Sequence, residues 1–185
     1  MPLLESKIWF AAKVMVLFAV PLFLWQWFTP AYNSALAWVS TGLMNLLENP
    51  HRTLLRAEGD TIRLFLLTSD GPRDTGVASY GPNLHFNMVI LVALILSTPI
   101  SPVLRRLRSL LIGLGILFLT HVAYEMASTQ LLHLSNLQTG AQLQQKFYYH
   151  AVAFFQFMGL QLVPLLIWGG FYLRNRNRAA SPGGV

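Results

Sequence analysis

Long apolar blocks separated by shorter polar stretches dominate this chain and set its predicted architecture. Four blocks are each long enough to cross a bilayer, which takes about 20 residues of helix. They occupy residues 8–29, 84–104, 109–127 and 147–173. The pattern predicts an all-α membrane protein with four transmembrane helices in one integral-membrane domain, residues 1–173. The basic residues 174–185 follow it as a tail that we expect to be disordered.

The long connection between the first two blocks, residues 30–83, carries two patterns of its own. In residues 33–48, apolar positions recur at roughly helical spacing among polar ones, which predicts an amphipathic helix at the membrane interface. Residues 61–68 form a β-prone run between turn sequences at 58–60 and 69–72, which predicts a short β-hairpin or paired strands. The connection is therefore expected to combine an interfacial helix with a short β-prone loop.

The distribution of positive charge predicts the orientation in the membrane. Lysine and arginine residues exceed the acidic ones near the N-terminus, in the turn 105–108 and in the tail 174–178. Cytoplasmic segments of membrane proteins carry such an excess. Both termini are therefore expected in the cytoplasm (N-in, C-in), and residues 30–83 and 128–146 outside it.

Composition supports a membrane protein and excludes several kinds of chemistry. Hydrophobic residues make up 54% of the chain and charged residues 11%, whereas soluble domains carry roughly 25% charged residues. The net charge of +6 comes from basic residues beside the apolar blocks, so membrane lipid rather than nucleic acid is the expected surrounding. The chain has no cysteine, which excludes disulfides, thiolate metal sites and a cysteine nucleophile.

The predicted topology brings the unusual polar residues to one level near the outer face. His85 and Asn87 open the second span, and His150 opens the fourth. His121 and Glu125 lie in the outer half of the third span and share a helix face, because they are four residues apart. Polar and ionisable side chains within a membrane helix normally face protein or water.

These five residues admit three interpretations. The one we favour is structural: a hydrogen-bonded pair, His121 and Glu125, joins helices while the other histidines are interfacial. A zinc or copper site is a second, since imidazole and carboxylate suit both metals, with His85, His121, Glu125 and His150 as ligands. A His–Glu acid–base pair is the third.

The order of these elements resembles the exosortase and archaeosortase family of multi-span transpeptidases. In that family a β-prone extracytoplasmic segment leads into a helix with a nucleophilic cysteine, an arginine lies near the outer end of a later helix, and a histidine opens another. Here GDTIRLFLLTSDGPRDTG runs into YGPNLHFNMVILVALILSTP, and HAVAFFQFMG opens the last span with His150 and Gly159. Residues 83–85 read Asn-Leu-His and residues 121–125 contain no arginine. Only His150 matches a catalytic position, so the thiol chemistry of that family is excluded.

The chain looks most like a cysteine-less relative, the family of exosortase H-associated membrane proteins. This resemblance implies a non-catalytic, multi-pass protein of the bacterial inner membrane, without a cofactor, that assists sorting or processing of carboxy-terminally anchored surface proteins. An exosortase or its substrate would be the membrane-protein partner, bound in an outer groove between the second, third and fourth spans. Small residues would permit the close approach of helices: Gly113, Gly115, Ala151, Ala153 and Gly159. A metal-dependent membrane enzyme and a structural subunit of a larger complex remain alternatives.

Overall fold

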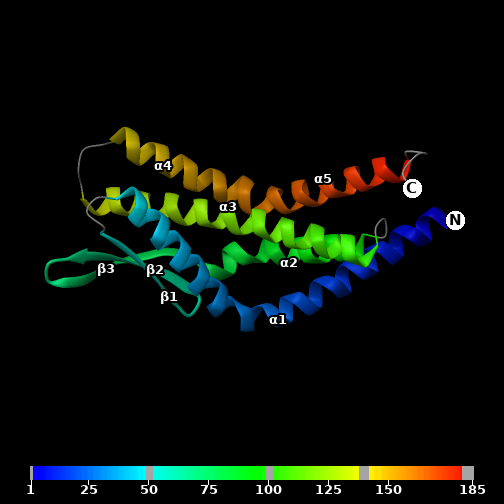
Figure 1. The fold of residues 1–185 in the computed structure, drawn as a ribbon, viewed down its shortest axis with the longest axis horizontal. Coiled ribbons are helices and arrows are strands. Elements are labelled where there is room, and N and C mark those ends of the chain that lie inside the picture. Colours follow the sequence, from blue (N-terminus) through cyan, green and yellow to red (C-terminus); the bar gives the residue numbers. More distant parts are fainter. Residues whose placement is uncertain (1, 49–51, 99–101, 138–141, 181–185) are drawn as a thin grey trace.

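The computed structural model describes the chain except residues 1, 49–51, 99–101, 138–141 and 181–185, and it is mostly helical with one small sheet (Figure 1). The side chains of some residues within the helices, His85 among them, are also outside the description. The helices are α1 (Pro2–Leu47), α2 (Gly81–Ser97), α3 (Val103–Leu137), α4 (Gln142–Phe154) and α5 (Leu160–Ala180), with a π-helical turn (Phe155–Gly159) between the last two. The strands are β1 (Thr53–Glu58), β2 (Thr61–Thr68) and β3 (Gly71–Tyr80).

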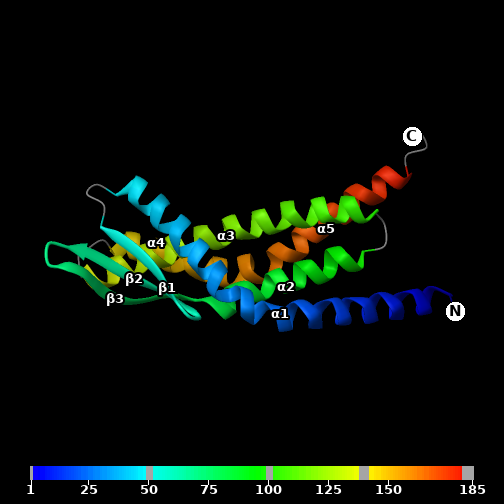
Figure 2. The same ribbon diagram turned by 60° about the horizontal axis from the view of Figure 1, so that its bottom comes forward.

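The molecule is elongated, with the sheet near one end and both chain termini near the other (Figure 1, Figure 2). The end of α2 and the start of α3 also lie at the end that holds the termini. The C-terminal half of α1 and the C-terminal half of α3 run alongside the sheet. The basic segments of the sequence are thus at one end, and the sheet is at the other.

The prediction of two separate helices, a span at 8–29 and an interfacial helix at 33–48, is wrong, because α1 includes both segments. It is one helix of 46 residues, with Pro21 and Pro30 inside it, and it bends about midway along its length (Figure 1). A proline inside a helix removes a hydrogen bond and costs about 3 kcal/mol. The helix nevertheless continues beyond Pro30, because burial of one face of its outer half within the fold offsets this cost. That face includes Leu36, Ala37 and Met44.

The predicted hairpin is confirmed and is part of a larger sheet. Three antiparallel strands pair in the order β1-β2-β3. Gly59 takes a φ of 58° in the turn between β1 and β2, and its carbonyl accepts a hydrogen bond from Asn33 Nδ2 at 3.0 Å. On the next strand Ile62 and Leu64 are fully buried and form a core with residues of α1 and α3.

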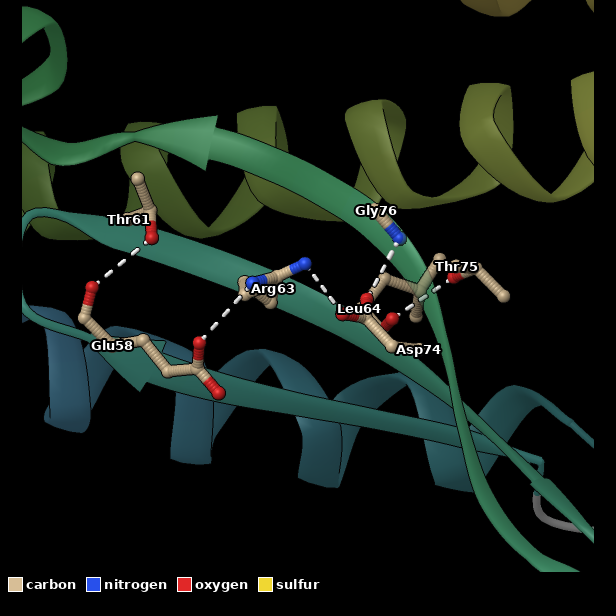
Figure 3. A network of polar contacts seen from close by, with 7 residues as sticks. All are labelled: Glu58, Thr61, Arg63, Leu64, Asp74, Thr75 and Gly76. Atoms are coloured by element: carbon tan, nitrogen blue, oxygen red, sulfur yellow. Dashed lines mark hydrogen bonds and ion pairs between the residues drawn. The ribbon is translucent and has the colours of Figure 1, made fainter.

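The face of the sheet that turns away from this core is charged (Figure 3). Arg63 lies between Glu58 and Asp74, with carboxylate oxygens at 3.5 Å and 2.5 Å from its guanidinium nitrogens. These side chains are partly exposed, so each pair contributes less than about 1 kcal/mol to stability. Their mixed charge is typical of a surface in contact with water.

Two described helices are long and apolar enough to cross a membrane, namely α1 from Ala11 to Leu47 and α3 from Val103 to Ser135. Gln142–Gly159 and Gln161–Arg174, bent by 49° at the break between them, would together make a third. The apolar part of α2, Phe86–Ser97, is shorter. The described residues therefore confirm a membrane protein with long apolar helices. They do not confirm four transmembrane helices.

Helix α3 contains the predicted third span, residues 109–127, and continues to Leu137. One element boundary differs from the prediction. Helix α5 continues to Ala180, so the first part of the segment 174–185, expected to be disordered, is helical.

One of the small residues predicted to let a partner helix approach, Gly113, is packed instead against helices of this chain. A Cβ added to Gly113 would lie 3.0 Å from Leu91 Cδ2 and 3.1 Å from Ile167 Cγ2, so this glycine lets α3 approach α2 and α5. An added Cβ at Gly115 would meet no atom within 4 Å. Tyr32 packs against both apolar clusters of the fold, the one beneath the sheet and the one among α2, α3 and α5.

Candidate functional site

A buried polar cluster occupies the junction between the helices and the sheet. Its members come from four elements: Tyr32 on α1, Ser79 on β3, Asn87 on α2, and His121 and Glu125 on α3. His121 and Glu125 are fully buried, and Asn87 is 2% exposed. Groups this polar and this buried need hydrogen-bond partners, because an unmet donor or acceptor costs about 1–3 kcal/mol.

His121 bonds to two other helices through its two ring nitrogens. Asn87 Nδ2 lies 3.1 Å from Nε2, and Tyr32 Oη lies 2.7 Å from Nδ1. An amide nitrogen donates, so Nε2 accepts, and in a neutral imidazole the Nδ1–H then donates to the tyrosine oxygen. The tyrosine ring also packs edge-on against the imidazole, with centroids 5.9 Å apart. One side chain of α3 therefore joins α1 to α2.

Glu125, one turn further along α3, bonds to the sheet. The Ser79 hydroxyl donates a hydrogen bond to Oε1, whereas Oε2 has no hydrogen-bond partner among the described residues. The Oδ1 atom of Asn87 is in the same condition. A buried carboxylate with one free oxygen is costly unless it is neutral or paired with a group supplied from elsewhere.

The cluster contains some of the predicted site residues and not others. Asn87 and His121 are in direct contact, and Glu125 is on the next turn. The side chain of His85 lies outside the described residues. His150 is exposed on α4, where its ring packs against Tyr149 with centroids 5.6 Å apart, so it is not a member.

Sequence reasoning missed Tyr32 and Ser79. Tyr32 falls within the predicted break between two helices, so no helix face was assigned to it. Ser79 lies where the β-prone segment runs into the second apolar block, and one serine there gives no signal by itself.

The described side chains fit a hydrogen-bonded link better than a reactive centre. Both nitrogens of His121 are engaged, and neither His121 nor Glu125 can touch a substrate unless the helices separate, because both are fully buried. No group of three histidine, aspartate or glutamate side chains within the described parts is arranged to hold a metal ion.

A second feature is an open cleft lined by residues of the C-terminal part of α3 and of α4. These two segments lie near the end of the molecule that holds the sheet (Figure 1). Its volume is about 540 Å³. Most of the residues that line it are polar, and none of them is acidic. They are Leu131, Ser135, Gln142, Gln145, Lys146 and Tyr149.

Comparison with known proteins gives one match. The model of a protein family described as exosortase H-associated membrane protein covers residues 5–174. No curated protein and no solved structure matches significantly. The family match spans all the elements that build the polar cluster, and it confirms the resemblance read from the sequence. The chain therefore belongs to the family of exosortase H-associated membrane proteins.

Proposed function

We propose that this protein is a non-catalytic, multi-pass partner of an exosortase in the bacterial inner membrane, where it assists sorting of carboxy-terminally anchored surface proteins. Family membership over residues 5–174 is the observation that supports this most strongly. The absence of cysteine adds a chemical argument, since thiol-based transpeptidation must then be performed by the partner.

Helix dimensions support a placement in the bilayer. Trp9 and Trp27 are both exposed on α1 and lie roughly 27 Å apart at 1.5 Å per residue. Arg105 and Glu125 lie roughly 30 Å apart on α3 by the same measure. Both spacings match the hydrocarbon core of about 30 Å, and tryptophan is enriched at its borders.

In this placement four segments cross the bilayer and both termini are cytoplasmic. Helix α2 has 17 residues and a length of roughly 25 Å, which approaches the thickness of the hydrocarbon core. The sheet, the outer half of α1 and the end of α3 then lie outside the membrane.

The polar cluster has a structural part in this proposal. It lies at the outer border of the membrane, where it fixes three helices and the sheet to one another through His121 and Glu125. A rigid junction there would hold the sheet and the outer helices in one arrangement for a partner that works at the same border.

The experiment is co-purification from native membranes. The chain with an affinity tag is isolated from cells in which the organism's own exosortase carries a second tag. We expect a complex in defined stoichiometry. An unrelated four-span protein with the same tag is the control, and an exosortase yield equal to this control would refute the proposal.

A further inference from the structure

We propose that the open cleft between α3 and α4 binds the headgroup of an anionic phospholipid, with the lipid phosphate beside Lys146. The cleft is lined by the C-terminal part of α3 and the first part of α4. The proposal rests on the membrane placement within the proposed function, and its tests do not involve the exosortase. It gives the chain a specific lipid ligand in addition to a protein partner.

The residues of α4 that line the cleft lie on one face of the helix. They follow one another at the spacing of neighbours on a helix surface: Gln142, Gln145, Lys146 and Tyr149. At the same spacing, Val152 packs against the core beneath the sheet. Gln156 then donates a hydrogen bond of 3.1 Å to the hydroxyl of Tyr124 on α3. This face of α4 therefore turns toward α3, although the residues that line the cleft are all polar.

The opposite side of α4 is apolar and exposed. Leu143 is 83% exposed, Phe147 66% and Phe154 60%, and their spacing of four and seven residues places them on one side of the helix. A helix at the surface of a soluble protein has the reverse arrangement, with its apolar side against the fold. In a membrane protein the apolar side contacts lipid, and polar side chains that turn toward a neighbouring helix indicate a functional site.

The charge of the cleft favours an anion. Lys146 is the only lysine or arginine between Arg108 and Arg174, and the chain has no acidic residue after Glu125. Within the described parts of the chain, no carboxylate lies within ion-pair distance of the Lys146 ammonium group. Lysine commonly binds phosphate groups in proteins.

Neighbouring side chains can supply further hydrogen bonds to a phosphate. Gln142 and Gln145 each have an amide group, and Tyr149 has a hydroxyl. All three groups can donate a hydrogen bond to an oxyanion. The cleft thus offers one positive charge and several donors, without an acid that would repel the ligand.

A positive charge at this position is unusual for the outer side of a membrane protein. Lysine and arginine are concentrated on the cytoplasmic side, whereas the proposed placement puts Lys146 on the outer side. It directly precedes the apolar block at residues 147–173, so it lies near the level of the lipid headgroups. Because its side chain lines the cleft, a phosphate bound there would meet it.

The surroundings favour an amphiphilic ligand over a free anion. The volume of about 540 Å³ falls within the range of about 300–1,000 Å³ that is common for ligand sites. Leu143 and Phe147 expose apolar surface on another side of the same helix, along which acyl chains can lie. No acid lines the cleft, so the cation of a zwitterionic headgroup would lack a partner. Phosphatidylglycerol, which has a net negative charge, is the expected class of ligand.

The first test measures lipid binding by native mass spectrometry. The purified and delipidated chain in detergent micelles is titrated with phosphatidylglycerol, with phosphatidylcholine that has the same acyl chains, and with inorganic phosphate. We expect saturable binding of phosphatidylglycerol and weaker binding of the other two compounds. Equal affinity for phosphatidylcholine would refute the selectivity for an anion, and equal affinity for inorganic phosphate would refute a lipid as the ligand. Absence of saturable binding would overturn the proposal as a whole.

The second test locates the ligand in the cleft. Lys146→Gln removes the charge of an exposed side chain, so the protein should fold as before. Its Kd for phosphatidylglycerol should rise about tenfold, as expected for the loss of a hydrogen bond to a charged group. Lys13→Gln removes an exposed lysine of α1 and should leave the Kd unchanged, and Lys146→Arg should retain binding. An unchanged Kd for Lys146→Gln would overturn the proposal.

A matched pair of glutamine variants tests which face of α4 binds the lipid. Gln145 lines the cleft, whereas its exposed neighbour Gln144 does not. Gln145→Ala should raise the Kd about threefold, as expected for one uncharged hydrogen-bond donor, and Gln144→Ala should not change it. Equal effects of the two substitutions would refute binding in the cleft. Since the exosortase is absent from these measurements, a negative result would leave the proposed partnership intact, and a failed co-purification would leave the lipid site intact.

Discussion

Replacement of His121 by alanine tests whether the polar cluster holds the helices together. The substitution removes a fully buried imidazole and both of its bonds, the one at 2.7 Å to Tyr32 and the one at 3.1 Å to Asn87. It leaves a tyrosine hydroxyl on α1 and a buried amide on α2 without these partners.

The expected loss of stability follows from these contacts. Hydrogen bonds between helices in a membrane protein contribute about 0.6 kcal/mol on average and up to about 1.7 kcal/mol each. Two of them give about 1–3 kcal/mol, and the cavity left by the ring adds about 1–2 kcal/mol. We therefore expect His121→Ala to lower the free energy of unfolding by about 2–5 kcal/mol. Tyr32→Phe, which removes one bond and no ring, should cost about 1 kcal/mol.

The assay is equilibrium unfolding in mixed micelles with increasing dodecyl sulfate, followed by circular dichroism. The double variant measures coupling, because two residues in one network lose less together than the sum of their separate losses. A loss below about 0.5 kcal/mol for His121→Ala would refute the account of the cluster as a link between helices. An equal loss of unfolding free energy for Tyr32→Phe and His121→Ala would contradict the assumption that His121 makes a second stabilising hydrogen bond, to Asn87.

Three further predictions concern other parts of the chain. Gly113→Leu should lower the free energy of unfolding by about 1–3 kcal/mol in the same assay, because the new side chain meets Leu91; an unchanged stability would contradict the packing of α3 on α2. Asp74→Asn should change stability by less than about 1 kcal/mol, because its ion pair with Arg63 is partly exposed; a larger loss would mean that the sheet depends on this network. Elemental analysis of the purified protein should find no stoichiometric zinc or copper, since both nitrogens of His121 are engaged; one equivalent of metal that disappears in His121→Ala would instead establish the metal site.

The sequence predicted well those elements whose signal is local. Long uncharged runs identify membrane helices, and the turn sequences around residues 61–68 identify the β-hairpin. His121 and Glu125, four residues apart in the sequence, are both buried on α3, and Asn87 contacts His121. In each case neighbouring residues in the chain determine the outcome.

The rest depends on contacts that are distant in the sequence. Pro30 and the polar residues after it favour a break in α1, but the sheet packs against the following turns and keeps the helix continuous. That contact joins segments whose pairing no local pattern specifies. Tyr32 and Ser79 belong to the polar cluster for the same reason, since each reaches it only after α1, the sheet and α3 have come together. His150 was expected there from topology alone, and the exposed position of α4 leaves it outside.

The most direct measurement of the central claim is the sorting of a carboxy-terminally anchored surface protein in living cells. Cells without this chain should process the surface protein more slowly, and the unmodified chain should restore the rate. His150→Ala changes an exposed histidine, the position that resembles a catalytic residue of exosortases. It should restore the rate fully, because in the proposed function the chain is a non-catalytic partner. Unchanged sorting in the absence of the chain would contradict the account. So would a His150→Ala variant that is present at normal level, retains the exosortase and yet fails to restore sorting.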